Sequence, residues 1–256
     1  MSLPRIIPVL LLDYDGLVKT VKFKKPNYLG DPINAVKIFN DKLADEIVVL
    51  DITATEEGRK PNFDLIQEIG SEAFMPFAYG GAIDNVEDAI RILKFGAEKI
   101  ILNKIVFTNP QLVTDLASKI GSSSVVVCID IKKNLFGKYE VYSDRGRKNT
   151  KLDPIEHAKA MIELGAGEIF VNNISNDGVM QGYDWKYLTK LITAVEVPVV
   201  VCGGAKSKDD MLNLFKISDV SGCAAGSMFV YNGIHKAFLI SYPNVEGIIK
   251  TIKNEL

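Results

Sequence analysis

ADEIVVLDI at residues 44–52 has a second version, AGEIFVNNI at residues 166–174, which begins 122 residues further along the chain. Each stretch is apolar for most of its length and ends in polar residues, as strands covered on both faces of a parallel sheet do. A second pair, PFAYGGA at 76–82 and PVVVCGGA at 198–205, has nearly the same offset. A repeat of about half the chain is typical of two duplicated (β/α)₄ half-barrels. The alternative is that strands and turns simply share a common composition.

The remaining chain alternates strand-like and helix-like patterns in the same way. GDPINAVKIFNDKLA at 30–44 offers Asp31 as a helix N-cap and Pro32 in the first turn. VEDAIRILKFG at 86–96 has apolar residues at helical spacing. Eight strand-like segments, each followed by a helical pattern, predict an α/β fold, a single (β/α)₈ TIM barrel. The expected strands are residues 5–12, 46–52, 74–81, 99–103, 124–130, 168–173, 198–204 and 219–227.

The chain is expected to form one domain. No linker rich in Pro, Gly or Ser interrupts it, so residues 1–256 are predicted to be a single barrel of two half-barrel repeats. One segment, 132–150, departs from the alternation. KYEVYS within it alternates polar and apolar residues, which predicts a small hairpin inserted after the fifth strand.

Composition and charge limit the classes of function. The chain is 47% hydrophobic with a net charge of -2, so no nucleic-acid partner is expected. Its three cysteines lie in apolar runs without metal or redox spacing, and its two histidines lie in helix-like segments. We therefore predict buried reduced thiols, no metal site and no cofactor. The sequence shows no signal-peptide pattern and no apolar run of membrane-span length, which favours a cytoplasmic protein without membrane contact.

Polar residues gather at the predicted carboxyl ends of the strands, where the active site of a (β/α)₈ barrel lies. Asp130 is either a loop N-cap or a general acid or base, and the second role needs another group across the mouth. Paired glycines either form tight turns or let backbone N–H groups approach an anion. The second reading predicts two phosphate sites on opposite sides of the mouth. The strand-end residues are Asp13 or Asp15, Asp51, Gly80, Gly81, Asn103, Lys104, Asp130, Asn172, Asn173, Asp177, Gly203, Gly204, Gly226 and Ser227.

Two further groups of charged residues leave alternatives open. Arg5, Glu46, Lys99 and Glu168 each stand at the start of a strand. Because side chains alternate between the two faces of a strand, these four either form an inward ring on the barrel floor or point outward into solvent. The basic residues of VKFKK at 21–25 belong either to a solvated loop or to a loop over a phosphorylated ligand.

The sequence as a whole resembles the cyclase subunit of imidazole glycerol phosphate synthase, the HisF type. The resemblance covers nearly the whole chain and is carried by DEIVVLDIT, PFAYGGAI, GAEKIILN, VVVCIDIKK, GAGEIFVNNISNDGVMQGYD and VVVCGGA. It implies a barrel that pairs at its N-terminal face with a HisH-type glutaminase and passes ammonia to its mouth. There the ammonia would convert a bis-phosphorylated formimino-ribulosyl aminoimidazole carboxamide nucleotide into imidazole glycerol phosphate and an aminoimidazole carboxamide ribonucleotide, in histidine biosynthesis.

The resemblance also implies roles for individual residues. Asp130 matches one of the family's two catalytic aspartates, and the four residues at strand starts match its charged ammonia gate: Arg5, Glu46, Lys99 and Glu168. The expected catalytic residues are Asp130, Asp13, Lys19, Asp51 and Asp177. The expected phosphate-binding residues are Gly81, Ala82, Asn103, Lys104, Gly178, Gly203, Gly204, Gly226 and Ser227.

Three positions depart from the family pattern. The ungapped alignment places Leu11 at the second catalytic aspartate, and leucine can neither give nor take a proton. A gapped alignment would bring Asp13 into register instead. Lys104 stands where the family has a threonine, and Arg145-Gly146 stands where it has Ser-Gly.

The presence of leucine at position 11 leaves alternative functional predictions. The chain is either a cyclase of the histidine pathway or a conduit that activates a glutaminase and passes ammonia onward. The second reading matches a HisF-like branch associated with surface-polysaccharide loci, where the ammonia is thought to reach a sugar amidotransferase. The run GLVKTVKFKKPNYLGDPINAVKIFN at 16–40 resembles that branch. A third possibility, a two-phosphate sugar isomerase, would need two acids and no gate.

Overall fold

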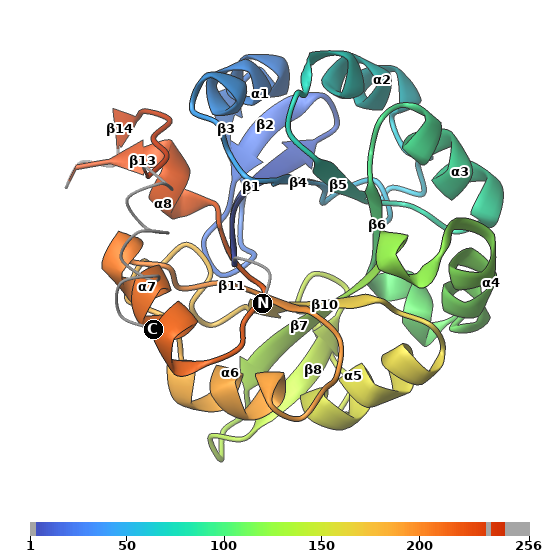
Figure 1. Ribbon diagram of the computed structural model, residues 1–256, viewed down its shortest axis with the longest axis vertical. Coiled ribbons are helices and arrows are strands. Elements are labelled where there is room, and N and C mark those ends of the chain that lie inside the picture. Colours follow the sequence, from blue (N-terminus) through green and yellow to red (C-terminus); the bar gives the residue numbers. More distant parts are fainter. Residues whose placement is uncertain (1–3, 234–236, 244–256) are drawn as a thin grey trace.

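The apolar segments predicted as strands pair side by side in chain order. The computed structural model describes residues 4–233 and 237–243, and in it eight parallel strands close into a barrel (Figure 1). The ring closes where the first strand pairs with the last, with Arg5 opposite Gly222, and the fifth and sixth strands pair with Asp130 opposite Asn172. The predicted (β/α)₈ fold is confirmed. The barrel strands are β1 (Arg5–Asp13), β4 (Ile47–Asp51), β5 (Phe77–Gly80), β6 (Lys99–Leu102), β7 (Val125–Lys133), β10 (Glu168–Asn173), β11 (Val199–Cys202) and β12 (Gly222–Ala225).

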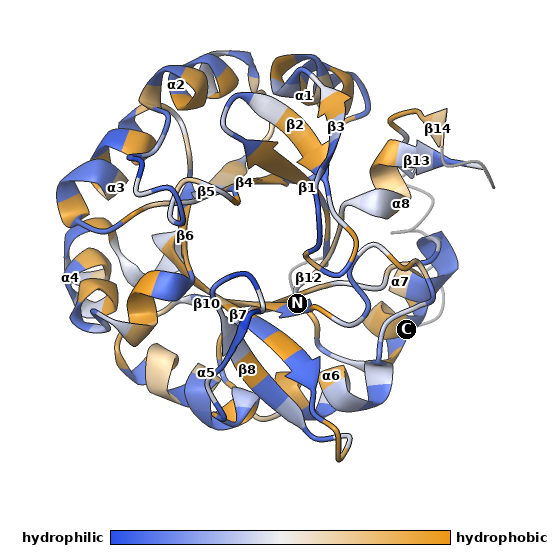
Figure 2. Cartoon of the chain, turned by 180° about the vertical axis from the view of Figure 1, so that it is seen from behind, coloured by the Kyte–Doolittle hydropathy of each residue, from blue (hydrophilic) through white to orange (hydrophobic). Residues whose placement is uncertain are grey.

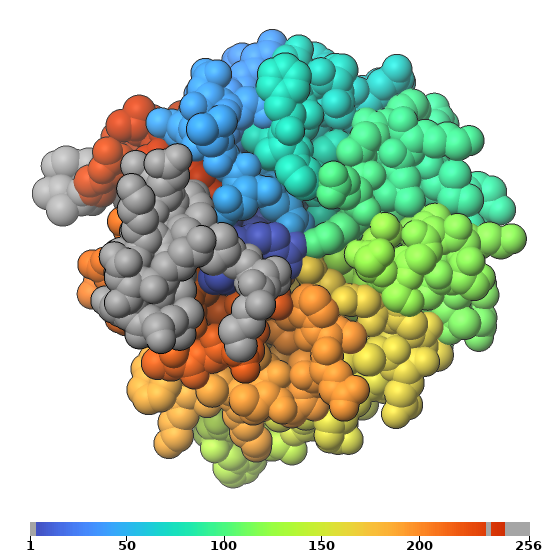
Figure 3. All heavy atoms as spheres, in the orientation of Figure 1, coloured from blue at the N-terminus to red at the C-terminus, as the bar shows by residue number. Residues whose placement is uncertain are grey.

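Helices surround the strands and follow one another around the ring in chain order (Figure 1). The sequence colours of the space-filling view run around the molecule in the same order (Figure 3). Most of the helices begin at a side-chain cap: for example, Asp31 accepts a hydrogen bond from the Ile33 N–H at 2.9 Å, and Asn85 accepts one from the Asp88 N–H at 2.7 Å. The helices are α1 (Pro32–Asp41), α2 (Phe63–Glu72), α3 (Val86–Lys94), α4 (Gln111–Ile120), α5 (Pro154–Glu163), α6 (Trp185–Ile192), α7 (Lys208–Ile217) and α8 (Ser227–Val230), with 3₁₀ turns η1 (Lys104–Phe107) and η2 (Ser122–Ser124).

The core has two layers, because side chains of a barrel strand alternate between the helices and the barrel axis. The outer layer packs strands against helices, whose turns mix hydrophobic and hydrophilic residues (Figure 2). The inner layer fills the barrel itself. It consists of Ile7, Val9, Val48, Ala78, Ile101, Val126, Cys128, Phe170, Val200, Cys202 and Ala224.

Two hairpins extend the barrel at the carboxyl ends of its strands. β7 continues past the barrel and pairs antiparallel with β8 (Tyr139–Ser143), which pairs with β9 (Lys148–Asn149), as expected from residues 132–150. The other hairpin, β2 (Gly16–Lys19) with β3 (Asn27–Gly30), follows β1 and was not predicted. Its strands are only four residues long, too short for alternation to be recognised. Near the C-terminus, β13 (Tyr231–Asn232) pairs with β14 (Ala237–Phe238).

The predictions from the cysteines and histidines have mixed outcomes. Cys128, Cys202 and Cys223 are buried and reduced, as expected. His157 lies in α5, whereas His235 lies outside the described residues. Among the helices of residues 4–233 and 237–243, none is long and apolar enough to cross a membrane.

Candidate functional site at the two ends of the barrel

The barrel floor is closed by a ring of alternating charges. Arg5 donates hydrogen bonds to Glu46 and to Glu168, the latter at 2.6 Å. Lys99 lies opposite, 3.1 Å from Glu168 and 3.5 Å from Glu46. Both glutamates are buried, and although burial lowers the pKa of Arg5, their negative charges raise it above its ordinary value. Of the two orientations left open by the sequence, the inward one is therefore correct.

Between floor and mouth the barrel axis is lined by apolar side chains and two thiols. In this section, the side chains that face the axis belong to the inner layer of the core. Leu11 and Leu50 pack against that layer at its mouth end. Charged groups thus occupy the floor and polar groups occupy the mouth, with an apolar section between them. Such a section carries a small neutral molecule at a much lower cost than an ion.

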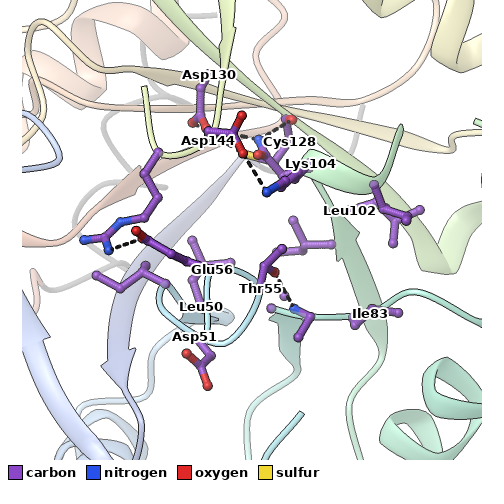
Figure 4. Close-up of a pocket in the computed structure, with 18 of the residues that line it drawn as sticks. Leu50, Asp51, Thr55, Glu56, Ile83, Leu102, Lys104, Cys128, Asp130 and Asp144 are labelled. Carbon is purple, nitrogen blue, oxygen red and sulfur yellow. Dashed lines mark hydrogen bonds and ion pairs between the residues drawn. The ribbon is translucent and has the colours of Figure 1, made fainter. Parts of the chain in front are cut away.

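A pocket of about 350 Å³ opens at the mouth, above this apolar section (Figure 4). Leu11, Leu50 and Ile101 form part of its base, and Asp130 and Asn172 line it from adjacent strands. The pocket is the natural place for chemistry in a (β/α)₈ barrel, because it lies at the carboxyl ends of the strands.

Asp130 is the central ionisable group of the pocket. Its carboxylate accepts a hydrogen bond from the Asn103 amide at 3.1 Å and lies 3.9 Å from the Cys128 thiol. Burial raises the pKa of Asp130 to about 7, and the negative charge of Asp177 adds to this rise while the Asn103 amide opposes it. A carboxyl group with this pKa can either donate or accept a proton near neutral pH.

The raised pKa of Asp130 predicts a pH-dependent cost to stability. The unfolded carboxyl ionises at about pH 3.9 and the folded one at about pH 7, so the unfolded state loses its proton first as the pH rises. As the pH rises from 4.5 to 7.5, we expect the free energy of unfolding of the parent to fall by about 2–4 kcal/mol relative to that of Asp130→Asn. Urea unfolding of both proteins at these pH values measures the difference, and an equal difference at both would contradict the assignment.

Leu11, and not Asp13, faces the pocket from β1. Leu11 lines the pocket beside Leu50, its register partner in β4. Asp13 lies two residues further on, at the start of the β1–β2 turn, where its carboxylate accepts a hydrogen bond from the Thr53 hydroxyl at 3.0 Å. It is not among the residues that line the pocket. The expectation that Asp13 acts at the mouth therefore finds no support in the geometry.

Asp51 lies at the edge of the pocket and organises the loop that follows β4. Its carboxylate accepts hydrogen bonds from the backbone N–H groups of Thr53 and Ala54 at 3.1 and 2.9 Å. Arg59 pairs with the same carboxylate at 3.2 Å and also lines the pocket. Through these contacts the Asp51 carboxylate stabilises the conformation of the loop.

Four of the expected phosphate-binding residues line the pocket: Gly81, Ala82, Asn103 and Lys104. Gly81 has φ +137°, and a Cβ there would lie 2.7 Å from the backbone oxygen of Asp51, so only glycine fits. The Asn103 amide is held by Asp130 and by the backbone oxygen of Cys128. Lys104 forms an ion pair with Asp144 at 2.7 Å.

The remaining expected residues lie on the other side of the mouth and outside this pocket. Lys19 is buried and pairs with Asp177 at 3.1 Å, while a Cβ on Gly226 would lie 2.8 Å from the Lys19 side chain. Ser227 is buried, and of the described residues none offers its hydroxyl a partner. This group consists of Lys19, Asp177, Gly178, Gly203, Gly204, Gly226 and Ser227. The residues expected to bind the two phosphates therefore lie on opposite sides of the mouth, and only one of the two groups lines this pocket.

Gly203 offers a test of this packing. It has φ +88°, and a Cβ would lie 2.5 Å from the backbone oxygen of Asn173. We expect Gly203→Ala to cost about 3 kcal/mol of unfolding free energy through backbone strain and overlap. Gly137 is a matched control, because it has φ +78° but open space around it. Gly137→Ala should cost about 1 kcal/mol, and equal losses in urea unfolding would show that the contact with β10 is unimportant.

The rim contains charged residues that were not predicted as site residues. Glu56, in the loop after β4, pairs with Arg145 at 3.0 Å and with Arg147 at 2.7 Å, both in the β8–β9 turn. These hydrogen bonds lower the pKa of Glu56. All three line the pocket. The partners are about 90 residues apart in sequence, so only the closed barrel brings them together.

Comparison with known proteins agrees with this geometry. The family model described as histidine biosynthesis protein matches residues 5–236. The chain belongs to this family. Within the histidine biosynthesis protein family, a Leptospira interrogans protein provisionally named imidazole glycerol phosphate synthase subunit HisF is 50% identical over 247 residues, 96% of this chain and 97% of the relative. A Vibrio vulnificus protein, also provisionally named a subunit of that synthase, is 51% identical over 241 residues, 94% of this chain and 93% of its own.

A third relative lacks the provisional qualifier in its name. The imidazole glycerol phosphate synthase subunit HisF of Petrotoga mobilis is 41% identical over 238 residues, 93% of this chain and 94% of its own. The HisF-type resemblance expected from the sequence is therefore confirmed, and the chain is a HisF-family synthase subunit.

Proposed function

We propose that this HisF-family subunit receives ammonia from a glutaminase docked on the N-terminal face of its barrel and conducts it to the mouth, where cyclisation is strongly impaired. The observation that carries the proposal is the combination of a complete charged ring on the floor with Leu11 in the mouth pocket. A conduit needs the first feature and can dispense with a second proton-transfer group.

The floor supports the conduit because it closes the apolar interior with ion pairs. Lys99 lies 3.1 and 3.5 Å from two buried glutamates, and a rearrangement of these ion pairs when the partner docks would open the ring to ammonia. Ammonia is neutral and small, so once past the ring it meets the apolar inner layer at little cost. The HisH-type partner is the one that the family resemblance implies.

The mouth supports impaired cyclisation because it holds one proton-transfer carboxyl where the reaction needs two. Asp130 is present and its pKa is about 7, but Leu11 occupies the position of the second carboxyl group. Loss of one acid or base from such a pair removes about 10²–10⁴-fold of the rate. Ammonia that is not consumed at the mouth can pass to a second acceptor, and the resemblance implies a sugar amidotransferase of surface-polysaccharide synthesis.

Full cyclase activity is the second candidate function. It is favoured by the pocket residues Asn103 and Asp130, which the resemblance matches to one phosphate-loop position and one catalytic acid. A neutral or charged Asp130 alone would then have to serve both proton transfers.

The two candidates are separated by an assay of the purified chain with ammonium chloride and the bis-phosphorylated nucleotide. We expect turnover at least about 100-fold below that of the Petrotoga mobilis relative under the same conditions. A rate equal to that of the relative would overturn the proposal. The conduit itself is tested by adding the glutaminase encoded in the same organism: faster glutamine hydrolysis supports it, and an unchanged rate contradicts it.

A further inference from the structure

Two hydrogen-bond acceptors lie side by side at the exit of the apolar section. Asp130 and Asn172 are register partners on the parallel strands β7 and β10, so their Cα atoms are about 5 Å apart. Both side chains point into the barrel, on the same faces as Cys128 and Phe170 of the inner layer. Their exposed fractions are 6% and 8%, and both line the mouth pocket.

The described residues leave part of the hydrogen-bonding capacity of these two acceptors unused. None of the described residues donates a hydrogen bond to the buried Oδ1 of Asn172. At Asp130, Oδ2 accepts from the Asn103 amide, whereas the one donor that the described part of the chain offers to Oδ1 is the weak thiol of Cys128 at 3.9 Å. A buried acceptor without a partner is destabilising, because it loses its hydration and gains no hydrogen bond in return. The arrangement therefore calls for a small ligand that donates hydrogen bonds.

The electrostatic surroundings favour a ligand that is or becomes positively charged. The ionisable groups near Asp130 are the Cys128 and Cys202 thiols, Asp177 and Lys19. Lys19 and Asp177 pair with each other at 3.1 Å, so their charges largely cancel. Burial also raises the pKa of both thiols, which keeps them neutral. Ionised Asp130 thus remains the uncompensated charge of this group.

We propose that the Asp130 carboxylate and the Asn172 amide oxygen form an ammonium-binding station at the mouth of the barrel. The inference rests on the proposed conduit, which brings ammonia to this point. Ammonia arriving as NH₃ takes the proton of the neutral Asp130 carboxyl, giving ammonium beside a carboxylate. Release reverses this transfer and returns the proton to Asp130. Asn172 acts as a positioning residue that supplies the second acceptor.

The test uses the purified full-length chain and ¹⁵N-ammonium chloride, with binding followed by broadening of the ammonium resonance. Asn172→Leu keeps the size of the side chain but removes the acceptor, and we expect it to raise the dissociation constant about tenfold. Asn172→Asp adds a negative charge and should lower the constant. Opposite shifts in two variants of one residue cannot arise from a general loss of stability.

Matched variants complete the experiment. Asn213→Ala, an exposed amide on α7, should bind ammonium as the parent does, and Asp130→Asn should lose binding. Equal affinity of the parent and Asn172→Leu would overturn the station, as would absence of binding to the parent. Neither result affects the cyclisation assay, because cyclisation can be impaired whether or not ammonium binds at Asn172. Conversely, ammonium bound at Asn172 in a chain that cyclises the nucleotide at the rate of its relative would refute the impaired cyclisation and leave the station intact.

Discussion

Replacing Leu11 by aspartate is expected to raise ammonium-dependent cyclisation of the bis-phosphorylated nucleotide by about 10²–10⁴-fold. Leu11 already faces the mouth pocket beside Leu50, so a carboxyl group there would share the cavity with Asp130. Two carboxyl groups in one site repel, so their pKa values separate. One then stays protonated as an acid while the other is ionised as a base, which is the division of labour that the reaction needs.

The matched control is Leu11→Asn, which has the shape of aspartate but cannot exchange a proton at neutral pH. We expect no gain from it. Initial rates at saturating ammonium chloride, with product followed by chromatography, compare the two variants directly. A gain with Leu11→Asn equal to that with Leu11→Asp would mean that leucine blocks the pocket by its bulk, and the argument from missing proton transfer would then be wrong.

Much of this architecture could be predicted from local patterns. The caps at Asp31 and Asn85 and the apolar runs of β4 and β10 are short-range signals, and they specify helices and parallel strands that have few ways to pack. The inward direction of Arg5 and Glu46 follows from strand parity once the register is known. Parity alone could not decide between the two faces of the strand.

The rim and the pocket were harder to predict for a physical reason. Glu56, Arg145 and Arg147 meet only when loops from distant parts of the chain fold together over the barrel. The turn after β1 bends at Tyr14, with φ 59°, and directs Asp13 toward Thr53. A residue count along an extended strand could not show that bend. Loop contacts of this kind depend on the closed fold, whereas strand and helix patterns depend on near neighbours.

Removing Arg5 from the floor should cause a loss of stability as large as that expected for Gly203→Ala. Arg5→Met leaves Glu46 and Glu168, whose side chains are 5% and 7% exposed, with Lys99 as their shared cation. Leaving a buried charge without its partner costs about 3–5 kcal/mol. Because the Arg5 side chain is 24% exposed, we expect about 3 kcal/mol in urea unfolding at neutral pH.

A comparable substitution of a surface cation by methionine isolates the effect of burial. Lys37→Met breaks an ion pair with Glu72 in which both side chains are exposed, 52% and 37%, and should cost less than about 1 kcal/mol. Adding Glu168→Gln to Arg5→Met removes one of the uncompensated carboxylates and should recover part of the loss. Such recovery would show that the four charges act as one network, since independent pairs would give additive losses. Additive losses would instead make the contacts independent ion pairs, and the floor would then not be the coupled ring that the conduit requires.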